Sequence, residues 1–345
     1  MLLRELGGGL QQSGPVSLAG FASDRPRWSR RHAGFLPLLT TRCHNLLSEL
    51  MDPRARVIRL GDGRSLGMYE FGDLTGRPCL YIPGTPASGL AGAAYSEAAR
   101  VAGVHLIALD KPGYGRSDLV SPRTLRAFAR DVAAVARALD MPRLCVFGES
   151  GGGPQALAAA ALMSGQVALT VIAAGTGPVD EPAMFAGMKP SNRRLLRVAR
   201  HAPFLLRPPM ALTRRSLLNP TRREAFVQAQ LAAAGPADRR AIEQMAALFD
   251  VTAAAADALR AGTKAVAVEL AMLARPWDFD LADVTGRVEL WHGADDVNVP
   301  PAVALLLAHR LPNAVAHVLP GEGHAVGWSR RQAIMASLSG AELAA

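Results

Sequence analysis

One serine in this 345-residue chain has the surroundings that a nucleophile requires. Ser150 lies in Gly148-Glu149-Ser150-Gly151-Gly152, after the apolar, β-prone run 144–147 and before the helix-forming run 154–163. A serine at a tight turn between a strand and a helix projects its hydroxyl beyond the edge of a sheet. The flanking glycines permit so sharp a turn because they carry no side chain. The pattern predicts attack by Ser150 on an electrophilic carbon, with the N–H of Gly151 facing the developing oxyanion.

The same glycines permit a second interpretation, a dinucleotide-binding turn. Gly151, Gly153 and Ala156 match the loose fingerprint G-x-G-x-x-A that follows a strand in such domains. The fingerprint expects an acidic residue at the end of the next strand, but the run 167–174 ends in Gly175-Thr176-Gly177. Four predicted strands also precede the strand that leads into this turn, whereas the fingerprint usually opens its domain. Both observations favour the nucleophile.

The composition is that of a globular protein with a substantial core. Half of the residues are hydrophobic, and no apolar stretch reaches the roughly 18 residues that a membrane-spanning helix needs. Three scattered cysteines, Cys43, Cys79 and Cys145, argue against a disulfide framework or a zinc site and favour a reducing, cytoplasmic location. The net charge of +9 is concentrated in the arginine-rich stretches 25–42 and 193–223. Since no nucleic-acid-binding motif accompanies this charge, we expect solvated helix faces and no nucleic-acid partner.

Predicted strands and helices alternate along much of the chain, which is typical of an α/β protein with a doubly wound, mostly parallel sheet. Strands are predicted at 57–60, 64–71, 78–82, 104–109, 144–147, 167–174, 288–291 and 315–319. Helices are predicted at about 88–102, 124–139, 154–163, 301–311 and from 326 onward. The first two strands form a hairpin, because glycines separate them.

The alternation is interrupted between residues 177 and 280, where prolines divide an Ala- and Leu-rich stretch into short helices. We therefore predict an inserted all-helical cap at 177–280, between core segments 51–176 and 281–345. Residues 1–50 show no regular pattern and no signal peptide, and we expect a dispensable, disordered extension. The natural start would then lie at or near Met51, unless apolar pieces of the extension pack on the cap.

Five motifs in order make residues 57–340 resemble the α/β-hydrolase superfamily. The motifs are Pro83-Gly84-Thr85-Pro86, Asp110-Lys111-Pro112-Gly113-Tyr114-Gly115-Arg116-Ser117, Gly148-Glu149-Ser150-Gly151-Gly152, His292-Gly293-Ala294-Asp295-Asp296-Val297-Asn298-Val299-Pro300 and Gly321-Glu322-Gly323-His324. The resemblance implies the α/β-hydrolase fold with a helical cap, and catalytic residues in the chain order serine, acid, histidine.

The resemblance assigns a role to each matching residue. Ser150 corresponds to the nucleophile, His324 to the base that takes its proton, and Asp296 to the acid that orients the base. Two alternative acids remain: Asp295 is adjacent to Asp296, and Asp180 follows the strand after the nucleophile, where some members place the acid.

The family's oxyanion hole consists of two backbone N–H groups, which the resemblance places on Gly151 and Thr85. Pro83-Gly84 stands here where many members have His-Gly, but the donors are backbone groups and need no histidine. The hydroxyl of Thr85 could add a further donor. The loop 110–118 is a structural part of the family's site and lines its floor.

The activity implied is that of a serine hydrolase that cleaves an ester, lactone, thioester or related acyl bond, without metal or organic cofactor. A carbon–carbon bond hydrolase or an acyltransferase of this fold would use the same residues, and a non-catalytic ligand-binding module would keep only the scaffold. We expect a small-molecule substrate with an apolar acyl or aryl group. Candidate cap residues for its pocket are Met184, Phe185, Met188, Phe204, Met210, Phe226, Met245, Phe249 and Met272.

Overall fold

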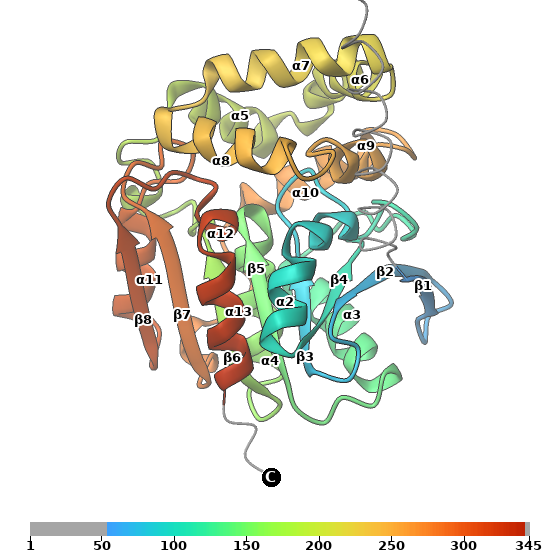
Figure 1. Ribbon diagram of the computed structural model, residues 1–345, viewed down its shortest axis with the longest axis vertical. Coiled ribbons are helices and arrows are strands. Elements are labelled where there is room, and N and C mark those ends of the chain that lie inside the picture. Colours follow the sequence, from blue (N-terminus) through green and yellow to red (C-terminus); the bar gives the residue numbers. More distant parts are fainter. Residues whose placement is uncertain (1–53, 342–345) are drawn as a thin grey trace, which may run out of the picture. The chain divides into compact units, whose positions relative to one another are not determined.

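The computed structural model describes residues 54–341, so the extension predicted for residues 1–50 lies outside the described part. The strands are β1 (Arg54–Arg59), β2 (Ser65–Gly72), β3 (Arg77–Ile82), β4 (Val104–Leu109), β5 (Leu144–Glu149), β6 (Val167–Ala173), β7 (Arg287–Gly293) and β8 (Ala314–Leu319). They form one sheet in the order β1-β2-β4-β3-β5-β6-β7-β8 (Figure 1). The pairs β1–β2 and β2–β4 are antiparallel and the other five are parallel. The predicted doubly wound, mostly parallel sheet is confirmed.

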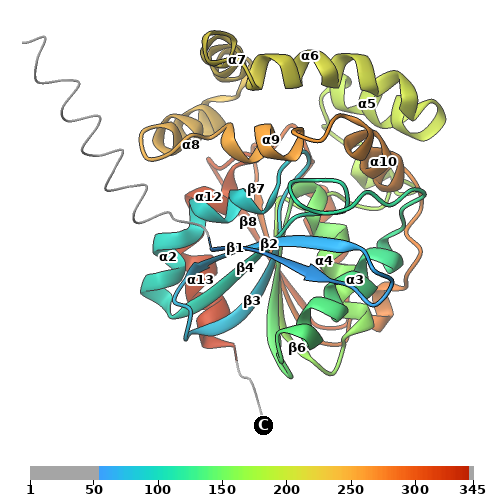
Figure 2. The ribbon, with the colours of Figure 1, turned by 90° about the vertical axis from the view of Figure 1, so that its right-hand side faces the viewer.

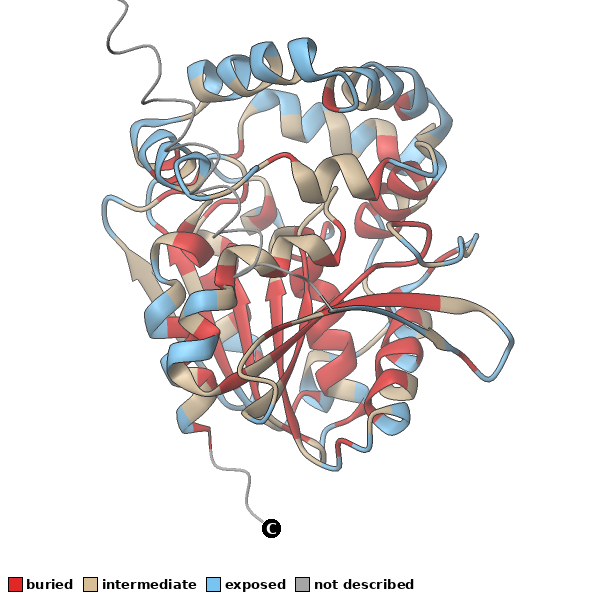
Figure 3. Cartoon of the chain, turned by 45° about the vertical axis from the view of Figure 1, so that its right-hand side comes forward, coloured by how far each residue is buried: buried red, intermediate tan, exposed pale blue. Residues whose placement is uncertain are grey.

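Helices lie on both faces of the sheet, as Figures 1 and 2 show. They are α2 (Ser96–Ala102), α3 (Leu125–Ala138), α4 (Gly153–Leu162), α11 (Ala302–Arg310), α12 (Val326–Ser329) and α13 (Arg331–Gly340). In β3, Cys79 and Tyr81 belong to the buried cluster that includes α2 and α13, whereas Leu80 and Ile82 belong to the cluster that includes α3 and α4. Alternate side chains of this central strand therefore build the two halves of the core. Figure 3 shows the resulting buried interior.

The helix predicted over about 88–102 consists of two elements, the 3-10 helix η1 (Gly89–Tyr95) and α2. The two glycines in η1 explain the difference. A Cβ on Gly89 would lie 2.6 Å from Tyr69, and one on Gly92 would lie 2.7 Å from the ring of Phe71. Glycine allows this segment to approach the sheet closely, but glycine is also a weak α-helix former.

The stretch from 177 to 280 contains helices and no strand, and all of its residues are described. It is followed directly by η5 (Leu281–Asp283). Its elements are η3 (Pro182–Met184), α5 (Pro190–His201), η4 (Pro203–Leu206), α6 (Arg207–Leu217), α7 (Pro220–Ala233), α8 (Pro236–Ala246), α9 (Ala253–Ala258) and α10 (Lys264–Leu273). Five of these elements start with proline, which needs no N–H acceptor in the first turn of a helix. We refer to residues 177–280 as the helical insertion; their division from the core as a cap domain stays a prediction.

The helices of the insertion gather beyond one end of the sheet, at the top of Figure 1. Their outward surfaces are largely exposed, as Figure 3 shows. A separate buried cluster lies inside the insertion and includes Ala199, Leu206, Leu259 and Leu270, together with Tyr114 from the loop after β4. Across residues 54–341, no helix combines the length and the apolar character needed to traverse a bilayer.

Candidate active site

Ser150 occupies the turn between β5 and α4 with a φ of +50°. For a residue with a side chain, this left-handed conformation costs about 1–2 kcal/mol. Such strain persists where the surrounding structure holds the residue in place. Here the N–H of Thr176 donates to the carbonyl oxygen of Ser150 at 3.1 Å. The turn therefore has the geometry that the glycine-flanked serine predicted.

The glycines on either side of Ser150 are required by close packing. A Cβ on Gly148 would lie 2.6 Å from the Cβ of Ala156, on the first turns of α4. A Cβ on Gly152 would collide with the backbone carbonyl oxygen of Ile82, at the end of β3. The turn is thus packed tightly between α4 and the end of β3.

The loops after β7 and β8 bring the two other predicted residues to Ser150. Nε2 of His324 lies 3.0 Å from Oγ of Ser150, and Nδ1 of His324 lies 2.8 Å from Oδ2 of Asp296. In the neutral tautomer with hydrogen on Nδ1, the ring donates to Asp296 and accepts the hydroxyl hydrogen of Ser150. Three residues spread over 174 positions of sequence therefore form one continuous hydrogen-bonded chain.

Among the three candidate acids, only Asp296 contacts His324. Its side chain is fully buried, whereas Asp295 and Asp180 are exposed. Oδ1 of Asp296 accepts the N–H groups of Asn298 at 2.8 Å and Val299 at 3.0 Å. These bonds fix the carboxylate, so Oδ2 faces the imidazole.

The contact between Asp296 and His324 sets the protonation of both partners. Burial raises the pKa of Asp296, but His324 and His292 outweigh burial and hold the pKa well below its usual value of 3.8. Burial lowers the pKa of His324, but the carboxylate of Asp296 outweighs it and raises the pKa above its usual value of 6.5. Asp238 and Glu149 raise the pKa of His324 further. The site thus favours an ionised acid beside a histidine whose pKa is raised.

The loop after β3 lies directly against the Ser150 turn. A Cβ on Gly84 would lie 3.2 Å from the Cβ of Ser150, and one on Gly151 would meet the side chain of Thr85. The N–H groups of Thr85 and Gly151 have no acceptor among the turn, loop and side-chain hydrogen bonds of residues 54–341. Both predicted oxyanion donors therefore belong to loops that touch beside the nucleophile.

A cavity of about 310 Å³ opens onto Ser150, His324, Thr85 and Gly151. The helical insertion contributes most of its apolar wall, namely Met184, Met188, Leu195, Leu196, Leu270 and Leu273. Of the nine insertion residues predicted to line a pocket, only Met184 and Met188 do so here. Leucines on α5 and α10 supply the rest, and sequence analysis did not single them out.

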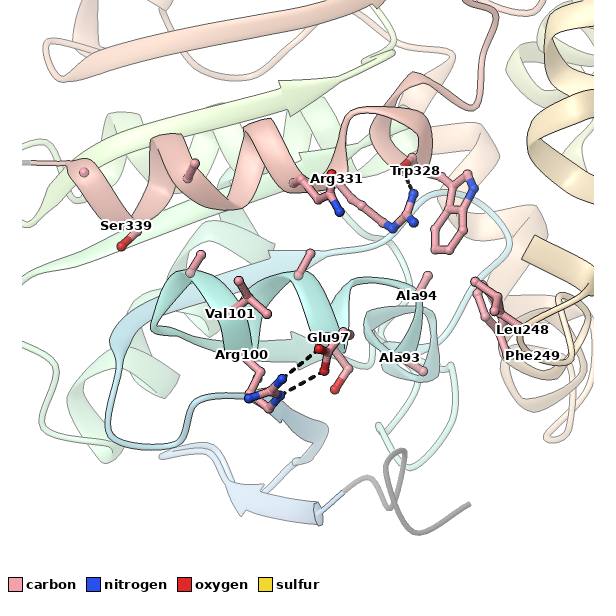
Figure 4. A pocket seen from close by; sticks show the side chains of 17 residues that line it. Ala93, Ala94, Glu97, Arg100, Val101, Leu248, Phe249, Trp328, Arg331 and Ser339 are labelled. Atoms are coloured by element: carbon pink, nitrogen blue, oxygen red, sulfur yellow. Dashed lines mark hydrogen bonds and ion pairs between the residues drawn. The ribbon is translucent and has the colours of Figure 1, made fainter. Parts of the chain in front are cut away.

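A larger cavity, about 1040 Å³, lies between α2 and α13 (Figure 4). Phe249 and Trp328 meet at one end of it with ring centroids 5.5 Å apart. Arg100 and Glu97 form an ion pair along its wall, and Val101 is exposed. None of the residues around Ser150 lines this cavity, so it is separate from the candidate site.

Asp238, on α8, is a residue that sequence analysis missed. Its side chain is buried, and its Oδ1 accepts the N–H of Ala325 at 2.9 Å, directly after His324. His292, at the end of β7, has Nε2 2.9 Å from the oxygen of Val299 and 3.3 Å from Oδ2 of Asp296. An isolated acid within a polar helix carries no motif, so no local signal marked Asp238.

Comparison with known proteins agrees with the fold. A model described as the alpha/beta hydrolase family matches residues 79–337. The chain therefore belongs to the alpha/beta hydrolase family, and it is an enzyme of hydrolase type. The resemblance seen in the sequence motifs is confirmed.

Individual proteins that resemble this chain have low sequence identity to it. A 2-hydroxy-6-oxononadienedioate/2-hydroxy-6-oxononatrienedioate hydrolase from Cupriavidus pinatubonensis is 28% identical over 67% of this chain and 74% of its own length. A thermophilic esterase from Thermogutta terrifontis is 21% identical with a TM-score of 0.56, covering 83% of this chain and 96% of that one. An esterase from Rhodococcus sp. ECU1013 is 20% identical with a TM-score of 0.58, covering 84% and 99%. The two structures support the fold alone.

The tight packing around the Ser150 turn leads to a prediction about stability. Gly152→Ala should lower the free energy of unfolding by about 1–3 kcal/mol, because its Cβ conflicts with backbone that cannot move aside. Gly165→Ala is the matched control, since a Cβ there meets nothing within 4 Å. Thermal denaturation of both variants measures the difference, and equal midpoints would contradict the packing described here.

The raised pKa of His324 generates a pH prediction. Only neutral His324 accepts a proton, so kcat/KM should fall as the pH drops through the His324 pKa, and the midpoint should lie above 6.5. Asp238→Asn keeps the acceptor for Ala325 but removes a charge that raises this pKa, so the midpoint should move to lower pH. A profile without an acid limb, measured where chemistry limits the rate, would contradict this assignment.

Proposed function

We propose that the protein is a serine hydrolase that cleaves carboxylic esters or related acyl bonds through an acyl-enzyme on Ser150. The observation that carries this proposal is the hydrogen-bonded chain from Ser150 through His324 to Asp296, with separations of 3.0 and 2.8 Å. A binding module has no need of a buried carboxylate that raises the basicity of a histidine beside a strained serine.

In the proposed reaction, Oγ of Ser150 attacks the acyl carbon while Nε2 of His324 takes its proton. The N–H groups of Thr85 and Gly151 stabilise the negative oxygen of the tetrahedral intermediate. His324 returns the proton to the leaving oxygen, and the alcohol departs. A water molecule, deprotonated by His324, then attacks the acyl-enzyme and releases the acid and the free serine. Asp296 stays ionised and stabilises the imidazolium in both halves.

The cavity supports a small substrate with an apolar acyl group. Its volume of about 310 Å³ is at the lower end for ligand pockets, and methionines and leucines form much of its wall. Asn192 and Asn298 add polar groups to the lining.

The small volume of the cavity favours short or medium acyl chains over long ones. The kcat/KM for p-nitrophenyl butyrate should therefore be higher than that for p-nitrophenyl palmitate.

Replacement of the nucleophile tests the proposal. Ser150→Ala should lower kcat by about 10⁴-fold or more, because no oxygen remains to form the acyl-enzyme. A fluorophosphonate should add one phosphonyl group to the wild-type protein, detected by mass spectrometry, and none to Ser150→Ala.

Ser164→Ala, an exposed serine just after α4, is the control and should label and turn over like wild type. Full turnover by Ser150→Ala would contradict the mechanism. A wild-type protein that neither labels nor hydrolyses any ester would favour the ligand-binding alternative.

A second candidate function is hydrolysis of a carbon–carbon bond. The relative from Cupriavidus pinatubonensis is named for a hydroxy-oxo-dienedioate, a compound with no ester bond to break. A cavity of about 500 Å³, lined by Arg193, Arg197 and Arg200, shares Leu196 with the cavity at Ser150. Guanidinium groups bind carboxylates well, which supports an acidic substrate of this kind. An assay with 2-hydroxy-6-oxononadienedioate, in which loss of its ultraviolet absorbance reports cleavage, separates the two candidates. Cleavage of this compound would favour the carbon–carbon bond hydrolase.

A further inference from the structure

A group of charged and polar side chains is buried beneath the loops that carry the predicted oxyanion donors. Lys111, Gln155 and Glu269 are completely buried, and Tyr114 and Arg123 surround them. Burying charges is unfavourable unless each charge is well paired, and an apolar replacement is often as stable. A contribution to stability is therefore a weak explanation for burying this group. The contacts of its side chains indicate a role in the active site.

Lys111, directly after β4, donates to the loop after β3. Its Nζ lies 2.8 Å from the carbonyl oxygen of Gly84 and 3.3 Å from Oγ1 of Thr85. It also lies 2.8 Å from Oε1 of Glu269, on α10 of the helical insertion. These three acceptors use the three hydrogens of the ammonium group.

Gln155, on α4, makes the corresponding contact on the other side of the oxyanion hole. Its Nε2 donates to the carbonyl oxygen of Gly151 at 2.9 Å and to Oε1 of Glu269 at 2.8 Å. Arg123 donates to the side-chain oxygen of Gln155 and fixes its orientation. Tyr114 donates to the other carboxylate oxygen of Glu269. One carboxylate thus connects both loops.

We propose that Lys111, Gln155 and Glu269 are positioning residues for the oxyanion hole, and that Lys111 makes the Thr85 hydroxyl a third donor to the oxyanion. This inference rests on the proposed function, because it assigns these side chains to the same intermediate on Ser150.

The planarity of the peptide unit supports the positioning role of Lys111. The carbonyl of Gly84 and the N–H of Thr85 belong to one peptide unit and point in opposite directions. Because Lys111 donates to this carbonyl oxygen, the N–H of the same unit points away from Lys111. In the proposed arrangement, this N–H faces the oxyanion on Ser150. Hydrogen bonding of a cation to the carbonyl also polarises the N–H of the same unit.

The hydrogen bonding of the Thr85 hydroxyl supports its role as a third donor. Lys111 donates to its oxygen, so the hydroxyl hydrogen is free to donate elsewhere. Thr85 lines the cavity at Ser150, and its side chain lies against Gly151. An oxyanion held by the N–H groups of Thr85 and Gly151 is the acceptor that this position offers.

The protonation states agree with these roles at neutral pH. Burial lowers the pKa of Lys111 to about 8, with the charge of Glu269 opposing the shift. Burial raises the pKa of Glu269, but Lys111 and Arg123 outweigh burial and keep it below its usual value. Lys111 is therefore a cationic donor, and Glu269 an ionised acceptor.

The double variant Lys111→Met/Glu269→Gln tests the network by removing one positive and one negative charge together, so the net charge of the buried group is unchanged. With p-nitrophenyl butyrate, kcat should fall about 10²-fold while KM stays close to the wild-type value, because the network acts on the intermediate. Binding of a trifluoromethyl ketone, which forms an oxyanion on Ser150, should weaken in parallel with kcat/KM.

Arg287→Met/Glu289→Gln is the matched control, since it removes a 2.6 Å ion pair with a buried carboxylate in β7, outside the network. This control should keep the wild-type kcat and ketone affinity. Unchanged kcat and ketone affinity in Lys111→Met/Glu269→Gln would overturn the proposal.

Substitutions of Thr85 provide a second, independent test. Thr85→Val removes the hydroxyl at constant shape and should lower kcat at least about 10-fold, whereas Thr85→Ser should restore it. Combined with Lys111→Met/Glu269→Gln, Thr85→Val should have a smaller effect than in wild type, because Lys111 acts partly through that hydroxyl. A wild-type kcat in Thr85→Val, or fully additive effects, would refute the third donor.

These outcomes are distinguishable from failure of the proposed function. If the wild-type protein hydrolyses the ester and Ser150→Ala does not, the function stands whatever the network variants show. If Ser150→Ala is as active as wild type, the proposed function fails first.

Discussion

The left-handed backbone of Ser150 is the constraint on which the site depends. With a φ of +50°, the residue projects its side chain out of the turn between β5 and α4, and the neighbouring glycines allow the turn to fit against β3 and α4. Because the loops after β3, β7 and β8 follow parallel strands, they reach the same edge of the sheet. His324, Asp296 and Thr85 arrive beside Ser150 for this reason.

The helical insertion does more than supply apolar walls to the cavity. Asp238 on α8 holds the backbone that follows His324, and Glu269 on α10 holds the side chains that contact Gly84, Thr85 and Gly151. Each half of the site is therefore tied to the insertion by one buried carboxylate. Movement of α8 or α10 would therefore shift His324 or the loops at Gly84 and Gly151, which carry the proposed base and oxyanion donors, as well as the wall of the cavity. On this account, substrate selection and catalytic geometry are mechanically linked.

Local patterns in the sequence predicted the sheet and the turn at Ser150, whereas the family resemblance supplied His324 and, with Asp295 and Asp180 as alternatives, Asp296. Apolar runs between helical periods mark buried parallel strands, and glycine-flanked motifs mark the loops after them. Glu269 and Asp238 could not be predicted in this way, since their partners lie more than 80 residues away. Lys111 lay within a motif interpreted as structural, and the role proposed for it depends on its contacts with Gly84 and Thr85, which the sequence does not show. The 3-10 segment η1 was missed because tight packing of glycines overrides helical periodicity.

The central claim is that Ser150 attacks an acyl carbon whose oxygen then lies between the N–H groups of Thr85 and Gly151. A crystal structure of the protein phosphonylated by a fluorophosphonate tests it most directly, because the adduct imitates the tetrahedral intermediate. The account predicts a covalent bond from phosphorus to Oγ of Ser150, and a phosphonyl oxygen within about 3 Å of both backbone nitrogens. A phosphonyl oxygen directed away from these nitrogens, or an adduct on another residue, would contradict the account.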